Sequence, residues 1–175
     1  SKQAIYSQGI FNDTPKFIKI AMAEKLDGST TAKITQAIDN KLPISFIIID
    51  EGSNKDEGIP LGLLDRIPYF LNLEHVPFKQ IPKFQINPKK IKTAQTFLPS
   101  VEFPSEYIED LIILTNQLGL NNFRPVLFCL DTAQSLAAFR NSLKVEKEDI
   151  LESIALTISH KAQKIPENAA EEENN

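Results

Sequence analysis

Residues 44–50, which read Ile-Ser-Phe-Ile-Ile-Ile-Asp, are the stretch that decides the fold class. The β-branched and aromatic residues predict a strand, and because apolar residues occupy both of its faces, we expect a central strand covered on two sides. A first strand is predicted over 17–22. Between the two, apolar residues recur at helical spacing after Ser29 or Thr30, either of which could cap a helix. Strand, helix and buried strand together indicate a β-α-β unit.

Further strands and helices are predicted along the rest of the chain. Apolar runs indicate short strands over 83–86 and 124–130, and Asp131, with Gln134 three residues later, is expected to cap the helix that follows. Other helices are predicted around 60–73, over 87–98 with Asn87 as the cap, over 105–118 with Gly119 as the stop, and over 147–163. We therefore expect a single α/β domain over residues 1–164, in which a small, mostly parallel or mixed sheet of three to five strands packs with about five helices. Residues 165–175 are expected to form a disordered acidic tail.

The net charge of −4 is unevenly distributed along the 175 residues. Residues 164–175 carry −3 of it, which leaves a nearly neutral body with three arginines and without the dense basic surface that nucleic-acid binding requires. The single cysteine, Cys129, excludes an internal disulfide and favours a reducing compartment, and no apolar run is long enough to cross a bilayer. We expect a cytoplasmic protein with no nucleic-acid partner and no membrane insertion.

Common catalytic and metal-binding patterns are missing from the sequence. The six glycines form neither G-x-G-x-x-G nor the phosphate-binding loop that ends in Gly-Lys-Ser/Thr. His75, His160 and Cys129 are the whole set of histidines and cysteines, too few for a zinc site. We expect Cys129 to be a buried structural thiol and His160 to stabilise a helix C-terminus. No cofactor, metal or catalytic residue is predicted, and the enzyme question stays open with a leaning toward no activity.

Two acidic residues form the candidate ligand site. Asp50 and Asp131 each follow a predicted strand, and ligands of open α/β sheets bind at the carboxyl ends of parallel strands. If the two strands are neighbours, these carboxylates could hold Mg²⁺. The competing interpretation is that Asp131 only caps a helix. A small-ligand-binding protein or Mg-dependent enzyme is therefore the alternative function.

The segment 59–73 holds more large apolar residues than one short helix face can bury. It either covers the core as a lid or is exposed, and exposed apolar patches mark partner surfaces. The leading hypothesis is a non-enzymatic protein-interaction module that acts as an adaptor, a chaperone-like factor or a subunit of a larger assembly. Its partner would be another protein or a multiprotein complex, and a homo-oligomer is left open. The candidate partner-binding residues are Leu61, Leu64, Ile67, Tyr69, Phe70 and Leu73.

Overall fold

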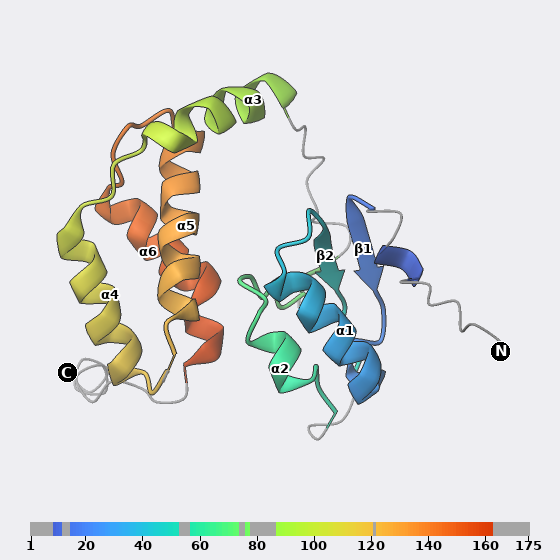
Figure 1. Ribbon diagram of the computed structural model, residues 1–175. Helices are drawn as coiled ribbons and strands as arrows, with labels where there is room; N and C mark the ends of the chain where they lie inside the picture. Colours follow the sequence, from blue (N-terminus) through green and yellow to red (C-terminus); the bar gives the residue numbers. More distant parts are fainter. Residues whose placement is uncertain are drawn as a thin grey trace, which may run out of the picture. The chain divides into compact units, whose positions relative to one another are not determined.

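The computed structural model in Figure 1 describes residues 9–11, 15–52, 57–73, 76–77, 87–120 and 122–162. The chain divides into two compact units, Ser1–Ile67 and Pro68–Asn175. The first is an α/β unit and the second is helical, and each is described here by itself. The predicted single domain over 1–164 stays a prediction, and the predicted tail lies outside the described residues, as does the predicted strand over 83–86.

The α/β unit is built on the predicted β-α-β arrangement. Strands β1 (Phe17–Ile20) and β2 (Ser45–Ile48) pair in parallel, with Ile18 opposite Phe46, and helix α1 (Gly28–Asp39) connects them. Short helices η1 (Gly9–Phe11), η2 (Ala23–Lys25) and α2 (Leu61–Leu64) complete the described part of this unit. The chain is thus α/β and mostly helical. Among the described residues the sheet has two strands, so the predicted three to five strands are not confirmed.

Helix α1 is capped by Asp27, and not by Ser29 or Thr30 as predicted. Asp27 has an extended backbone, and its Oδ1 accepts hydrogen bonds from the amides of Ser29 at 2.8 Å and Thr30 at 2.9 Å. These amides lie at the helix N-terminus and have no carbonyl partner within the helix. The hydrogen bonds from Thr30, its amide first and its hydroxyl second, hold the pKa of Asp27 below its usual value. A carboxylate therefore defines where the connecting helix begins.

The described residues of the helical unit form four longer helices. They are α3 (Pro88–Phe97), α4 (Ser105–Gln117), α5 (Arg124–Phe139) and α6 (Lys147–Thr157), with short helices η4 (Leu98–Ser100) and η5 (Ser159–Lys161). Helix α5 is the central one, because α3, α4 and α6 all pack against it (Figure 1). Its buried face supplies much of the core with small residues, which let the neighbouring helices approach closely: Val126, Cys129, Ala133, Ala137 and Ala138.

Residues 124–130 are helical, so the strand predicted there is wrong. Pro125 lies in the first turn of α5, where its missing amide costs nothing. The buried residues Val126, Cys129 and Ala133 continue at spacings of three and four, which is a helical period. The predicted strand ends at residue 130, whereas the same buried stripe continues beyond Asp131. Asp131 lies inside α5 and caps nothing, and Gln134 donates to the carbonyl of Val101 at 3.2 Å instead of closing a capping box.

Two helix ends agree with the sequence. Asn87 caps α3 by accepting from the amides of Lys89 and Lys90, next to Pro88 in the first turn. Gly119, after α4, has a φ of 76°, the left-handed conformation that favours glycine at a helix C-terminus. None of the helices in the described part of the chain is long and apolar enough to span a bilayer.

Candidate functional site

The predicted partner surface begins on α2. Leu61 is 82% exposed, whereas Leu63 is fully buried and Leu64 and Ile67 are half-buried. Because four consecutive helical residues point in different directions, one of them anchors the helix and another faces solvent. In this part of the segment, Leu61 is the one large apolar side chain that is mostly available to a partner.

Arg66 fastens α2 to α1 within the α/β unit. Its Nε and Nη2 donate to both carboxylate oxygens of Asp39 at 2.7–3.0 Å, and its Nη1 donates to the carbonyl of Gly62 at 2.7 Å. The side-chain hydrogen bonds to Asp39 raise the pKa of Arg66 above its already high value. Such a two-point contact pairs the opposite charges and also fixes the orientation of the guanidinium group. Neither residue stood out in the sequence, because the pair is 27 positions apart.

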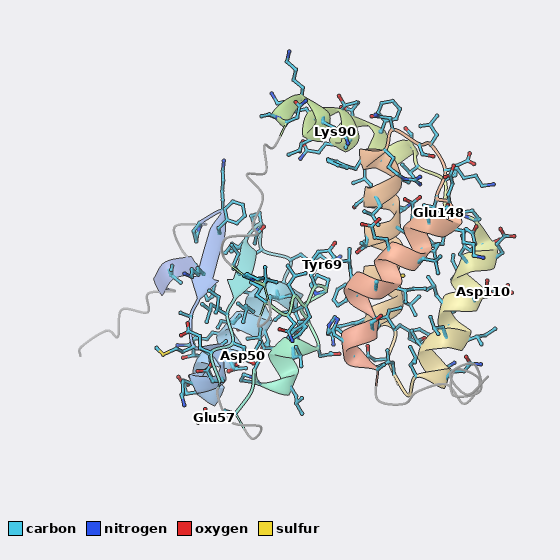
Figure 2. All side chains as sticks on the ribbon, turned by 180° about the vertical axis from the view of Figure 1, so that it is seen from behind. Asp50, Glu57, Tyr69, Lys90, Asp110 and Glu148 are labelled. Carbon is cyan, nitrogen blue, oxygen red and sulfur yellow. The ribbon has the colours of Figure 1, made fainter. Side chains whose placement is uncertain are left out.

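Tyr69 and Phe70 belong to the helical unit and contact its helices. The hydroxyl of Tyr69, labelled in Figure 2, lies 3.1 Å from that of Thr132 on α5. The ring of Phe70 stacks on His160 of η5 with centroids 5.4 Å apart. Both aromatic side chains are still close to half exposed, and Leu73 is 68% exposed. The six predicted partner residues are thus divided between the two units, and a single surface made by all of them stays a prediction.

His160 occupies an unusual environment for a histidine. Neither ring nitrogen has a hydrogen-bond partner among the described residues, so the ring does not cap the end of α6 by a hydrogen bond as an ordinary capping residue would. Burial first, and the neighbouring charge of Lys161 second, lower the pKa of His160 below its usual value. The neutral imidazole therefore serves as an aromatic packing partner for Phe70.

The structure does not support the reason for pairing Asp50 with Asp131. Asp50 follows β2, and its Oδ1 accepts from the amide of Gly52 at 3.0 Å, which closes a local turn (Figure 2). Asp131 is exposed within α5, in the other unit, and ends no strand. Within the described residues, no cluster of three or more histidine, cysteine or carboxylate side chains could hold a metal ion. The ligand site stays a prediction that has lost its geometric basis.

Cys129 is buried, as predicted, although it lies on a helix and not on a strand. Its Sγ lies 2.9 Å from the hydroxyl of Ser153 on α6. Burial raises the pKa of the Cys129 thiol, and the contact with Ser153 offsets only part of that rise. A thiol with a raised pKa and no access to solvent is a poor nucleophile, so Cys129 is a packing residue between α5 and α6.

A groove between α4 and α6 is the feature that sequence reasoning missed. Its volume is about 450 Å³, and we call it the α4–α6 groove. Both helices contribute residues at the spacing i, i+3, i+4 and i+7, which places them on one face of each helix. The apolar stripes of both helices are visible in the sequence, but nothing there shows that the two stripes leave a gap. The lining residues are Tyr107, Asp110, Leu111 and Leu114 from α4, and Lys147, Ile150, Leu151 and Ile154 from α6.

Comparisons with known proteins find similarity to part of the helical unit and to most of the chain. A family model of the AAA lid domain matches residues 109–175, which include α5, α6 and most of α4. Over 168 residues the chain is 31% identical to the magnesium-chelatase 60 kDa subunit of Cereibacter sphaeroides, covering 96% of this chain and 30% of that subunit. The magnesium-chelatase 60 kDa subunit of Rhodobacter capsulatus is 30% identical over 155 residues, covering 89% of this chain and 28% of the subunit. The chain thus spans less than a third of the length of these relatives.

Solved structures with a similar fold include the following example. It is the crystal structure of a protein from Cytophaga hutchinsonii that has been provisionally assigned as an ATPase. The TM-score is 0.61 with 15% identity, and the match covers 90% of this chain and 64% of that one. At this identity the likeness establishes the α/β fold alone.

These comparisons overturn the leading functional hypothesis. The prediction of a non-enzymatic adaptor or chaperone-like module is wrong, because the chain is similar to an AAA lid domain and to subunits of an enzyme, magnesium chelatase. The coarser expectation of protein partners agrees with the relatives, which are named as subunits of an enzyme. The sequence search for phosphate loops, metal clusters and nucleophiles could not find this relationship, because the match falls on a helical region that contains none of them.

Proposed function

We propose that this chain is an AAA-type module of a subunit of a magnesium-chelatase-type enzyme. The observation that carries the proposal is the extent of the similarity, which covers 96% of the chain at 31% identity and therefore includes both units. The lid-domain match also supports it, because it covers α5, α6 and most of α4 in the helical unit. In this proposal the α/β unit and the helical unit are parts of one ATP-dependent machine.

The residues of the chain indicate which part of that machine the module supplies. A phosphate-binding loop ending in Gly-Lys-Ser/Thr does not occur in its 175 residues. We therefore propose that the module works in the enzyme by contacting and coupling to other chains or regions, and that phosphate binding of the P-loop type belongs to them. This proposal retains the expectation of protein partners and places the module inside an enzyme.

A chimeric enzyme tests this function. The segment of the Cereibacter sphaeroides 60 kDa subunit that aligns with this chain is replaced by the 175-residue chain, and magnesium-chelatase activity is measured in the reconstituted enzyme. A deletion of the same segment gives the baseline. We expect the chimera to retain activity within about tenfold of the parent, which is a change of about 1.4 kcal/mol in the activation barrier, and the deletion to be inactive.

The control variant of the chimera carries Ala137→Asp, which puts a carboxylate at a fully buried position of α5. It should fall to the baseline if an intact helical unit is needed. A chimera that is folded by circular dichroism, incorporates into the enzyme and is nevertheless no more active than the deletion would refute the proposal. An equally active Ala137→Asp chimera would also count against it, because the inserted module would then be irrelevant to the activity.

A further inference from the structure

The α4–α6 groove has an apolar floor and partly exposed apolar walls. Leu111 and Ile150 are almost fully buried at its base, whereas Leu151 is 56% exposed at its edge. The two helices are held apart by their separate packing against α5 and lie side by side (Figure 2). An exposed leucine beside a groove of this size lacks the apolar cover that such side chains normally have in a protein interior.

The edges of the groove are acidic. Asp110 lies on the α4 side, and Glu106 lies one turn before it on the same helix. On the α6 side, Glu148 follows Lys147, which is the cation among the lining residues (Figure 2). All four charged side chains are exposed. The lining itself carries one carboxylate, Asp110, and one ammonium group, Lys147. The exposed carboxylates Glu106 and Glu148 lie outside the lining on the same two helices, and this excess of negative charge around the groove favours a cationic partner over an anionic one.

We propose that the α4–α6 groove is a docking site for a basic amphipathic helix of a partner protein. Two neighbouring stripes of apolar residues at helical spacing can accept the apolar face of a third helix, which is a common mode of peptide recognition. Lysine or arginine residues beside that apolar face would lie next to Asp110, Glu106 and Glu148. The proposal adds a specific surface and a partner chemistry to the module and does not depend on the identity of the enzyme.

The groove does not have the character of a small-molecule site. Such sites combine an apolar lining with a few buried polar groups that fix the orientation of the ligand. Here the polar lining residues, Asp110 and Lys147, are both exposed, and the buried lining residues Leu111 and Ile150 offer only hydrocarbon. Hydrocarbon inside and charge outside is the pattern that matches an amphipathic helix.

Helix α3 of a second copy of this chain is a poor candidate for the occupant. It is basic, with Lys89, Lys90 and Lys92, but its own apolar residues Ala94 and Phe97 already pack against the core of the helical unit. Ile91, which is 38% exposed, is the large apolar side chain that α3 itself still exposes, so this helix would bring lysines to the groove with little apolar surface to cover it. The occupant must supply both, so we assign the groove to a partner chain.

A peptide-binding experiment tests the proposal on the whole 175-residue chain. The probe is a fluorescein-labelled synthetic peptide of about 18 residues, long enough to form a helix when bound, with leucines at spacings of three and four and lysines on both flanks. A matched peptide replaces every lysine by glutamate. Fluorescence anisotropy gives the dissociation constants. We expect the lysine peptide to bind at least about tenfold more tightly than the glutamate peptide, and to weaken as salt is added.

Two pairs of variants locate the binding site. Leu151→Lys should weaken the lysine peptide at least about tenfold, whereas Leu127→Lys should leave it unchanged, because Leu127 is equally exposed, at 55%, but lies on α5 outside the groove. Asp110→Lys should weaken the lysine peptide and strengthen the glutamate peptide, whereas Asp131→Lys, also exposed and outside the groove, should do neither. Circular dichroism confirms that each variant is folded.

Three results would overturn the proposal. The first is a lysine peptide that does not bind, or binds no better than the glutamate peptide. The second is equal loss of binding with Leu151→Lys and Leu127→Lys. The third comes from analytical ultracentrifugation: self-association of the chain that Leu151→Lys abolishes would assign the groove to a second copy of this chain instead of a partner protein.

Discussion

Replacing Asp149 by alanine should destabilise the helical unit more than any exposed change on the same helix. Asp149 is 2% exposed in the first turn of α6, and its Oδ2 accepts from the amide of Glu146 at 3.0 Å, while the side chain of Glu146 closes the reciprocal half of a capping box. The same oxygen accepts a charge-assisted hydrogen bond from Nη2 of Arg140, at the end of α5. One carboxylate thus connects the end of one helix to the start of the next.

The magnitude follows from these contacts. A carboxylate in the first turn of a helix contributes about 0.5 kcal/mol through the helix dipole, and the capping hydrogen bond about 1 kcal/mol. The bond to Arg140 adds about 0.5–1 kcal/mol, discounted because the Arg140 side chain is 43% exposed and regains water when the bond is lost. Asp149→Ala should therefore cost about 2–2.5 kcal/mol. Glu148→Ala, an exposed carboxylate in the same turn, should lose only the dipole contribution of about 0.5 kcal/mol.

Urea denaturation followed by circular dichroism at 222 nm measures both free energies of unfolding, and a thermal melt checks them. At about 2–4 °C per kcal/mol for a chain of this size, Asp149→Ala should lower the melting temperature by about 4–10 °C and Glu148→Ala by about 1–2 °C. Asp149→Asn should fall between the two, because an amide oxygen can still accept from the Glu146 amide. Equal losses for the alanine variants at positions 149 and 148 would refute the assignment of the buried carboxylate as the connection between α5 and α6.

Three further predictions use other contacts. The Cys129 thiol, buried and with a raised pKa, should react with iodoacetamide at pH 7.5 at least about 100-fold more slowly in the native protein than in urea; equal rates would contradict the burial. Because the pKa of His160 is lowered in the folded state, the unfolded chain binds more protons as the pH falls. The contribution of His160 to the free energy of unfolding should therefore be full above its ordinary pKa near 6.5 and be lost as the pH falls through the folded-state pKa. His160→Gln should flatten this decrease in thermal melts from pH 7.5 to 5, and an unchanged profile would exclude His160 as its source. A double-mutant cycle with Arg66→Ala and Asp39→Asn should give a coupling free energy of about 1 kcal/mol, with Arg66→Lys recovering less than half of it, and a coupling near zero would show that this pair does not hold α2 on α1.

Local sequence signals predicted the β-α-β unit because they are consistent with one another there. The strand over 45–48 is rich in β-branched residues, and the helix before it has apolar residues at one period throughout. The predicted cap, Ser29 or Thr30, lies two to three residues beyond the observed cap, Asp27. All three residue types are good helix caps, and only the backbone geometry distinguishes among the three positions. Boundaries of this kind depend on where the chain turns, which short-range patterns define poorly.

The error over 124–130 has a different cause. Apolar residues on both faces of a short run fit a buried strand and a buried helix equally well. The deciding residues lie beyond the run, since Thr132, Ala133 and Ala137 continue the buried stripe of α5. The candidate ligand site depends on the same error. Asp131 follows a strand only if residues 124–130 form one, and the pairing of Asp131 with Asp50 assumes that both residues follow strands.

The sequence by itself determined the α/β class, the parallel β-α-β unit, the cap at Asn87 and the end of α4 at Gly119, because each depends on neighbours within a few residues. Only the tertiary structure decided the rest. Arg66 pairs with Asp39 across 27 positions, and Tyr69 contacts Thr132 across 63 positions. The groove is formed by α4 and α6, which are separated in the sequence by helix α5. Such contacts depend on how the elements pack, and the physical reason is that a helix shows its apolar face in its sequence but not which neighbour covers that face or how completely.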